Sequence, residues 1–165
     1  MIWILYVSIA LVVLVLSMAL VGLALPAGHV AARSASFASS PEIVWRALAD
    51  LDGHVRWRRG VKRIEQLDAT TFREHGPNGA ITYAIEADEP PVRRITRIAD
   101  DKLPFGGRWI YELAEAGGGT RLTITEDGFV KNPIFRLLSK TVFSPTRTIE
   151  QFLADLGTHL GIPST

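Results

Sequence analysis

Residues 39–60, SSPEIVWRALADLDGHVRWRRG, begin the part of the chain that decides the fold. Ser39 stands three residues before Glu42, as in a capping box, and Pro41 suits the first turn of a helix. Apolar residues then recur at helical spacing, at Ile43, Val44, Ala47, Leu48 and Leu51. Asp52-Gly53 ends this segment, and a short second helix or turn with Trp57 runs up to Gly60. The stretch predicts an amphipathic helix followed by a shorter one.

After Gly60 the hydrophobic pattern changes to a period of two, which predicts β-strands. Turn residues such as Gly76-Pro77-Asn78-Gly79 and the three glycines 117–119 separate the alternating segments. The segments cover residues 61–67, 70–75, 81–87, 92–99, 107–114 and 120–127. Residues 29–37, before the first helix, are expected to add one more extended segment. The sequence therefore predicts about seven strands, six of them in an antiparallel meander.

The end of the chain shows two apolar stripes at helical spacing. Asn132-Pro133 suits the start of a helix, and Ser144-Pro145 interrupts or kinks it. The second stripe runs from Ile149 to Leu160 and stops at Gly161. Only this long terminal helix can cover one face of the curved sheet. A sheet closed by a single helix tends to leave an elongated space between them, where small ligands bind.

Two segments resemble a known superfamily. Residues 40–65, SPEIVWRALADLDGHVRWRRGVKRIE, resemble the opening of the START/Bet v 1-like group, the SRPBCC or polyketide cyclase/dehydrase-like proteins. Residues 103–139, LPFGGRWIYELAEAGGGTRLTITEDGFVKNPIFRLLS, resemble that group's last hairpin and its entry into the closing helix. The resemblance covers roughly residues 31–160. It implies an α+β helix-grip fold with a hydrophobic cavity for a lipid, sterol, quinone or polyketide, and it implies no catalytic signature.

The first part of the chain has a different character. No charged side chain occurs between Met1 and Gly28, and residues 2–25 are almost wholly apolar. At about 1.5 Å per residue, this run reaches about 36 Å, enough to cross a hydrocarbon core of about 30 Å. Because basic residues from Arg33 onward follow the run and only the α-amine precedes it, the positive-inside bias predicts a cytoplasmic domain. The chain has no cysteine, which fits that compartment but decides little.

Two other interpretations of this run stay open. A cleaved signal peptide requires a basic start and a shorter apolar core, although the alanines between residues 24 and 32 could mimic a cleavage site. A buried core helix requires one polar face, which Ser8 and Ser17 do not form. We favour a single-pass membrane protein with three parts. These are a transmembrane anchor at residues 1–27, a short linker at 28–33 and an SRPBCC/START-like domain at 34–162.

Composition excludes some function classes. The net charge is +1, with 18 basic and 17 acidic residues, which argues against a nucleic-acid-binding module. One basic cluster, residues 56–63, is read as a solvated surface or as a contact for anionic headgroups. The four histidines are scattered in the sequence, so neither a metal site nor a cofactor is predicted. The partners expected are a hydrophobic small molecule or lipid and the membrane.

Candidate ligand-binding residues come from the strand faces and the terminal helix. Tyrosine hydroxyls in an apolar space need partners, and a ligand carbonyl could be one. Glu126 alternates with Leu122 and Ile124, which is compatible with an inward carboxylate near the cavity mouth or with a place on the surface or rim, whereas Glu86 and Glu112 are expected in water. Arg97 shares a strand face with Ile95, and its direction stays open. The candidates are Trp57, Tyr83, Arg97, Trp109, Tyr111, Glu126, Phe135 and Phe143.

Three functions remain compatible with the sequence. We favour a membrane-tethered module that binds a hydrophobic small molecule, because a tether concentrates the binding site beside molecules that partition into the bilayer. The alternative is a polyketide cyclase or dehydratase that uses acid–base groups in the cavity, with Glu126 as a candidate proton-transfer group. A ligand-free interaction domain is the third.

Overall fold

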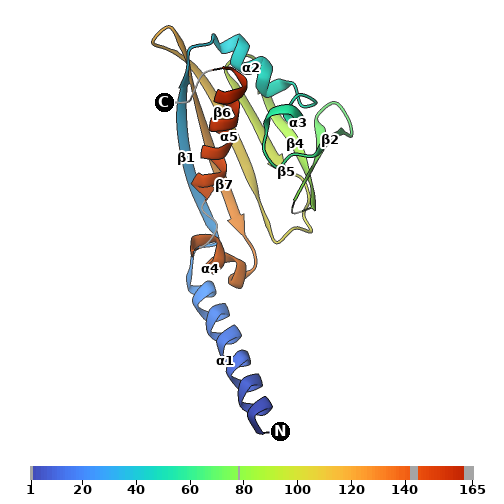
Figure 1. The fold of residues 1–165 in the computed structure, drawn as a ribbon, viewed down its shortest axis with the longest axis vertical. Helices are drawn as coiled ribbons and strands as arrows, with labels where there is room; N and C mark the ends of the chain where they lie inside the picture. Colours follow the sequence, from blue (N-terminus) through green and yellow to red (C-terminus); the bar gives the residue numbers. More distant parts are fainter. Residues whose placement is uncertain (1, 78, 142–144, 162–165) are drawn as a thin grey trace.

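The protein folds around one seven-stranded antiparallel sheet. The structure is a computed structural model, and it describes residues 2–77, 79–141 and 145–161. The strands lie in the order β1-β7-β6-β5-β4-β3-β2, so the first strand pairs with the last (Figure 1). Their bounds are β1 Gly28–Phe37, β2 Arg63–Gln66, β3 Thr71–Gly76, β4 Gly79–Glu89, β5 Arg93–Ile98, β6 Phe105–Ala116 and β7 Gly119–Val130. This is the predicted α+β helix-grip fold, with its curved sheet and terminal helix.

Three helices pack on one face of the sheet, which we call the inner face. These are α2 (Pro41–Ala49), α3 (His54–Trp57) and α5 (Pro145–His159), and α5 lies along β1 and β7 (Figure 1). The core between them contains fully buried side chains from each layer, among them Val44 of α2, Leu122 of β7 and Leu156 of α5. Burial of this apolar stripe against the sheet, at about 25 cal/mol per Å², is the main reason the helices adopt these positions.

The two ends of the sheet differ in what surrounds them. At one end, Val130 donates its backbone N–H to the Ala27 carbonyl (2.9 Å), and Lys131 donates to the Pro104 carbonyl (2.7 Å). We call this the anchor end, because it lies beside α1 (Ile2–Ala24) and α4 (Pro133–Thr141) (Figure 1). The other end, beside α2 and the β6–β7 hairpin, is the distal end.

The chain between α1 and the domain is not a linker. Residues 28–33 were expected to connect the anchor to the fold, but they form the first half of β1. They pair with β7 from Gly28↔Phe129 to Arg33↔Ile124. The pairing places His29 beside Gly128 and Ala31 beside Glu126, both on the inner face. Residues 28–33 therefore belong to the sheet. The strand therefore begins directly after α1.

The predicted interruption near Pro145 separates two helices. α4 ends at Thr141 and α5 begins at Pro145, which has no backbone N–H and suits a first helical position. By its length and composition alone, α1 is long enough and apolar enough to cross a membrane. It packs against α4 and otherwise stands apart from the domain (Figure 1).

Candidate functional site

Aromatic side chains gather on the inner face beneath α5. Phe152 of α5 lies at their centre, with ring centroids 5.4 Å from Trp57, 5.7 Å from Trp109 and 5.8 Å from Tyr111. The Trp57 and Trp109 rings meet Phe152 edge to face, an arrangement that aromatic quadrupoles favour. Because side chains alternate along β6, Trp109 and Tyr111 point to the same face. The structure therefore brings three of the predicted ligand-binding residues together.

Glu126 points inward from β7, and its carboxylate lies beside Trp109 at the edge of this aromatic group. Its Oε2 accepts a hydrogen bond from the Trp109 indole Nε1 at 2.8 Å. Its Oε1 lies 2.8 Å from Nε2 of His29 at the start of β1. The Glu126 side chain is 19% exposed, so part of the carboxylate remains accessible. A carboxylate has about four acceptor positions, and two are used here, which leaves room for a further donor.

Two glycines lie at the level of the His29 ring. A Cβ at Gly128 would lie 2.7 Å from the His29 ring, so a larger residue at this position would displace the ring. Gly107 faces Gly128 across the β6–β7 pair and has a positive φ of 141°. The inner face consequently carries no side chain from β6 or β7 at this level. His29 occupies part of that space and orients towards Glu126.

Tyr83 lies on the neighbouring part of the inner face. Its ring stacks on Phe72 with centroids 5.3 Å apart. Burial raises the pKa of its phenol, and the negative charge of Glu74 raises it further. Among the residues that the structure describes, the Tyr83 hydroxyl has no hydrogen-bond partner. The phenol stays protonated near neutral pH and can donate a hydrogen bond to a ligand.

One ion pair lies between Tyr83 and the helices. Arg58 donates to both carboxylate oxygens of Glu74, at 2.6 and 3.2 Å, and its guanidinium stands 5.2 Å from the centroid of the Phe152 ring. A bidentate pair of this kind holds both charges in a fixed geometry.

Burial raises the pKa of Tyr111 to about 12, while the positive charge of Arg58 opposes the shift. Neither tyrosine is therefore an acid or base near neutral pH.

Other predicted residues lie away from this group. Arg97 is on the outer face, where its Nε donates to Glu86 at 2.7 Å and its side chain is 41% exposed. Its strand pairs Arg97 with Arg108, whereas the inward positions of β5 are Arg94, Thr96 and Ile98. Phe135 lies on α4 and is more than half exposed. Phe143 falls outside the described residues.

Sequence reasoning missed His29, Arg58 and Glu74. His29 begins the segment predicted to be extended, but the domain boundary placed it in the linker, so it was not considered as a site residue. Arg58 belongs to the basic cluster, whose arginines pair within the fold rather than form a free positive surface. Arg56 pairs with Asp50, Arg58 with Glu74, Arg59 with Asp155 and Arg63 with Glu65. Spacing along the chain could not have indicated these partners.

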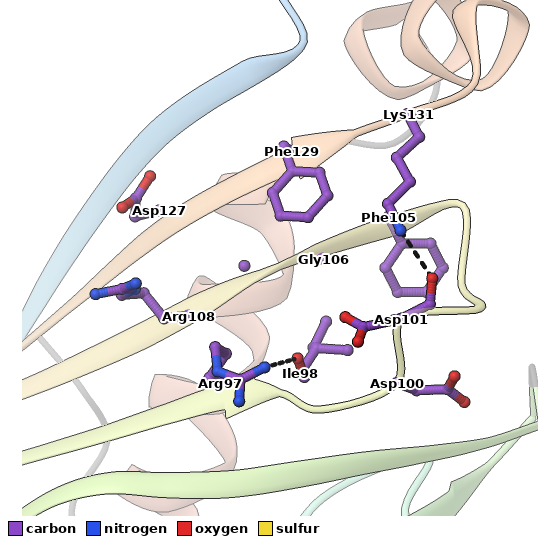
Figure 2. A pocket seen from close by; sticks show the side chains of 11 residues that line it. Arg97, Ile98, Asp100, Asp101, Phe105, Gly106, Arg108, Asp127, Phe129 and Lys131 are labelled. Atoms are coloured by element: carbon purple, nitrogen blue, oxygen red, sulfur yellow. Dashed lines mark hydrogen bonds between the residues drawn. The ribbon is translucent and has the colours of Figure 1, made fainter.

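A hollow of about 250 Å³ lies on the outer face at the anchor end (Figure 2). Its charged side chains balance, because Arg97, Arg108 and Lys131 stand against three aspartates. Those carboxylates belong to Asp100, Asp101 and Asp127. In the described part of the chain, no group of three or more His, Cys, Asp or Glu side chains could hold a metal ion. We take the inner-face group as the candidate ligand site, because it combines aromatic rings with the Glu126 carboxylate.

Comparison with protein families gives a match over residues 29–161, to the family described as polyketide cyclase/dehydrase and lipid transport. The chain belongs to this family. The match begins at His29, so it includes the whole sheet apart from Gly28, the first residue of β1. A comparison with curated proteins finds no match.

Solved structures share the fold of this family member. A START superfamily protein from Mycobacterium smegmatis has a TM-score of 0.66 at 17% identity, over 81% of this chain and 97% of the other. The Zhui aromatase/cyclase from Streptomyces has a TM-score of 0.67 at 15% identity, over 81% and 94%. The Aha1 dimer from Colwellia psychrerythraea has a TM-score of 0.61 at 15% identity, over 79% and 95%. These identities establish the fold alone.

Proposed function

We propose that this family member binds a hydrophobic small molecule on the inner face, between the sheet and α5, while α1 tethers the domain to a membrane. The observation that carries the proposal is the arrangement around Glu126. An inward carboxylate with spare acceptor capacity stands beside the partly exposed Trp109 and Tyr111. Ligand sites of this kind combine an apolar wall with a few polar groups that fix orientation.

The polar groups suggest what the ligand carries. Glu126 accepts hydrogen bonds, whereas the Tyr83 phenol donates them. A mostly apolar molecule with both a hydroxyl and a carbonyl would satisfy the two groups. Lipids, quinones and polyketides include molecules of this class, and the description of the family names both polyketides and lipids.

The tether supports a ligand that partitions into the bilayer. β1 begins four residues after α1 ends, so the domain stays beside the membrane that α1 crosses. Anchoring raises the effective concentration of the binding face beside a lipid-soluble molecule. Arg33 follows α1 closely, and we place the domain in the cytoplasm on that ground, following the positive-inside bias.

Mass spectrometry of the full chain, extracted in mild detergent, tests the binding. The wild type should carry a hydrophobic molecule that washing does not remove. Thr96→Trp should lose it, because Thr96 is an inner-face residue between Ile85 and Trp109. Thr125→Trp is the matched control, because Thr125 lies on the outer face opposite Ile110. Equal retention by both variants, or no bound molecule in the wild type, would contradict the proposal.

A second candidate function is acid–base catalysis on such a molecule. The 2.8 Å contact between His29 and Glu126 favours it, because a carboxylate that orients an imidazole is a common acid–base arrangement. His29→Gln would then keep the bound molecule but change the ratio of substrate to product found on the protein. If the protein is instead a ligand-free interaction domain, the wild type and every variant would carry no bound molecule.

A further inference from the structure

The end of α1 is packed against α4 rather than free. Gly22, the one buried residue of α1, lies against the first residue of α4. A Cβ at Gly22 would collide with the Pro133 carbonyl oxygen, so the two helices approach at a position that only glycine allows. α4 therefore meets α1 within its last turn.

Arg136 of α4 joins three segments at this point. Its Nη1 donates to the carbonyl oxygens of Gly22 (3.2 Å) and Leu25 (3.0 Å) at the end of α1, where backbone carbonyls lack partners further along the helix. Its Nε and Nη2 donate to the carbonyls of Val130 and Lys131, both at 3.2 Å. The guanidinium also places positive charge at the negative end of the helix dipole. α1, β7 and α4 are thus held in one arrangement.

Three phenylalanines are exposed at this same end. Phe105 is 37% exposed, Phe129 is 41% exposed and Phe135 is 52% exposed. Phe105 pairs with Val130, whose N–H bonds to Ala27, so Phe105 lies level with the chain that leaves α1. Figure 2 shows Phe129 and Lys131 at this end, and the Lys131 ammonium is 5.9 Å from the Phe129 ring centroid. The pairing with Val130 places Phe105 on the opposite face of the sheet from Phe129. Large apolar side chains exposed at one end of a domain mark a contact surface.

The length of α1 decides what these side chains meet. Its 23 residues extend about 35 Å, close to the hydrocarbon thickness of about 30 Å. If α1 spans the bilayer, its last turn lies at the boundary between hydrocarbon and headgroups. α4 contacts that last turn, and the anchor end of the sheet follows within a few residues. An interfacial segment buries its apolar side chains about 5–10 Å into that boundary.

We infer that the anchor end rests in the interfacial layer of the membrane, with Phe105, Phe129 and Phe135 in contact with lipid. The inference rests on the proposed membrane span. The partner is the lipid surface itself, and an uncharged phosphatidylcholine bilayer suffices. Lys131 stands beside Asp100 and Asp101 in the same hollow, so the charges there do not select anionic headgroups. The arrangement turns the inner face of the sheet to a fixed angle relative to the membrane.

Depth-dependent fluorescence quenching tests this inference on the full chain in phosphatidylcholine vesicles. The sequence has no cysteine, so single variants F105C, F129C and F135C each carry one environment-sensitive label. Nitroxide lipids with the quencher near the headgroup should reduce the emission of all three labels about twofold or more, the response of an interfacial segment. Quenchers near the bilayer centre should act less. Replacing part of the phosphatidylcholine with phosphatidylserine should leave the quenching unchanged.

Two further labels separate this inference from the proposed span. Leu14→Cys lies in the middle of α1, and central quenchers should act on it most strongly. Val92→Cys is more exposed than the three phenylalanines but lies at the distal end, near Leu113, and no lipid quencher should act on it. If Leu14→Cys is unquenched, the membrane span itself is wrong. If Leu14→Cys is quenched while the phenylalanine positions behave like Val92→Cys, the span stands and the interfacial contact is overturned. If the labels at the phenylalanine positions report an apolar environment but are not quenched by lipid, a protein covers them, and the interfacial contact is likewise overturned.

Discussion

At the distal end of the sheet Leu122 of β7 is fully buried, whereas seven residues further along the same strand Phe129 remains 41% exposed at the anchor end. Both are large apolar side chains on one strand, but they lie on opposite faces of the sheet. Leu122 of the distal half points to the inner face, against which α2 and α5 pack. Phe129 of the anchor half points to the outer face. The difference shows that the packed core lies on the inner face, whereas the outer face of the anchor half keeps a large apolar side chain partly exposed.

The largest predicted effect compares these two positions directly. Leu122→Ala should lower the free energy of unfolding by about 3 kcal/mol, because it removes buried methyl groups and leaves a cavity. Phe129→Ala should cost less than about 1 kcal/mol, because the ring is not enclosed. Denaturant unfolding of the detergent-solubilised chain measures both values. Equal losses would show that the anchor half is part of the same core.

The second prediction concerns His54, buried beneath α5. Burial lowers the pKa of its imidazole from 6.5 to about 3, and the positive charge of Arg58 adds to the shift. Because the unfolded state binds the proton more readily, the stability from neutral His54 is present above pH 6.5. It falls as the pH drops towards 3, by at most about 1.4 kcal/mol per pH unit.

Unfolding measured between pH 6.5 and 4 checks this slope. His54→Gln keeps a polar side chain near the Leu48 carbonyl, which lies 3.2 Å from His54 Nε2, and removes the titrating group. The variant should be less dependent on pH than the wild type. Identical slopes in both proteins would show that His54 titrates normally.

The smallest effect on stability is expected where α1 meets α4. Gly22→Val should push α4 away from the Pro133 contact, while the free energy of unfolding of the domain changes by less than about 1 kcal/mol. Amide hydrogen exchange should become faster in α4 and stay unchanged in the centre of β7. Ala10→Val, on the exposed middle of α1, is the control and should leave both unchanged. Slower or unchanged exchange in α4 would contradict the close approach of these helices.

The sequence predicted most of the fold because period-two alternation and turn glycines are strong local signals. Six strands follow the predicted order, with ends that differ by a few residues. The extended segment predicted at residues 29–37 is β1, but the boundary that placed residues 28–33 in a linker was wrong, because the partner strand of β1 lies about a hundred residues away and no local pattern shows the pairing.

The site was harder to predict than the fold. Alternation placed Trp109 and Tyr111 on one strand face and Glu126 on a face with Leu122 and Ile124, and in the structure both faces belong to the inner face of the sheet. The contact of Glu126 with His29 depends on the pairing of the first strand with the last, and the pairing of Arg58 with Glu74 depends on where α3 packs. No local pattern encodes either contact. Alternation also left Arg97 undecided, because apolar and charged residues occur on both faces of β5.

The most direct test of ligand binding on the inner face is site-specific photocrosslinking in native membranes. A photoreactive phenylalanine analogue replaces Tyr83 on the inner face or Thr125 on the outer face, and intact-mass spectrometry follows irradiation. The account predicts one adduct of defined, apolar composition at Tyr83 and none at Thr125. Adducts at neither position, or the same bulk phospholipids at both, would contradict the claim that the inner face binds a specific hydrophobic molecule.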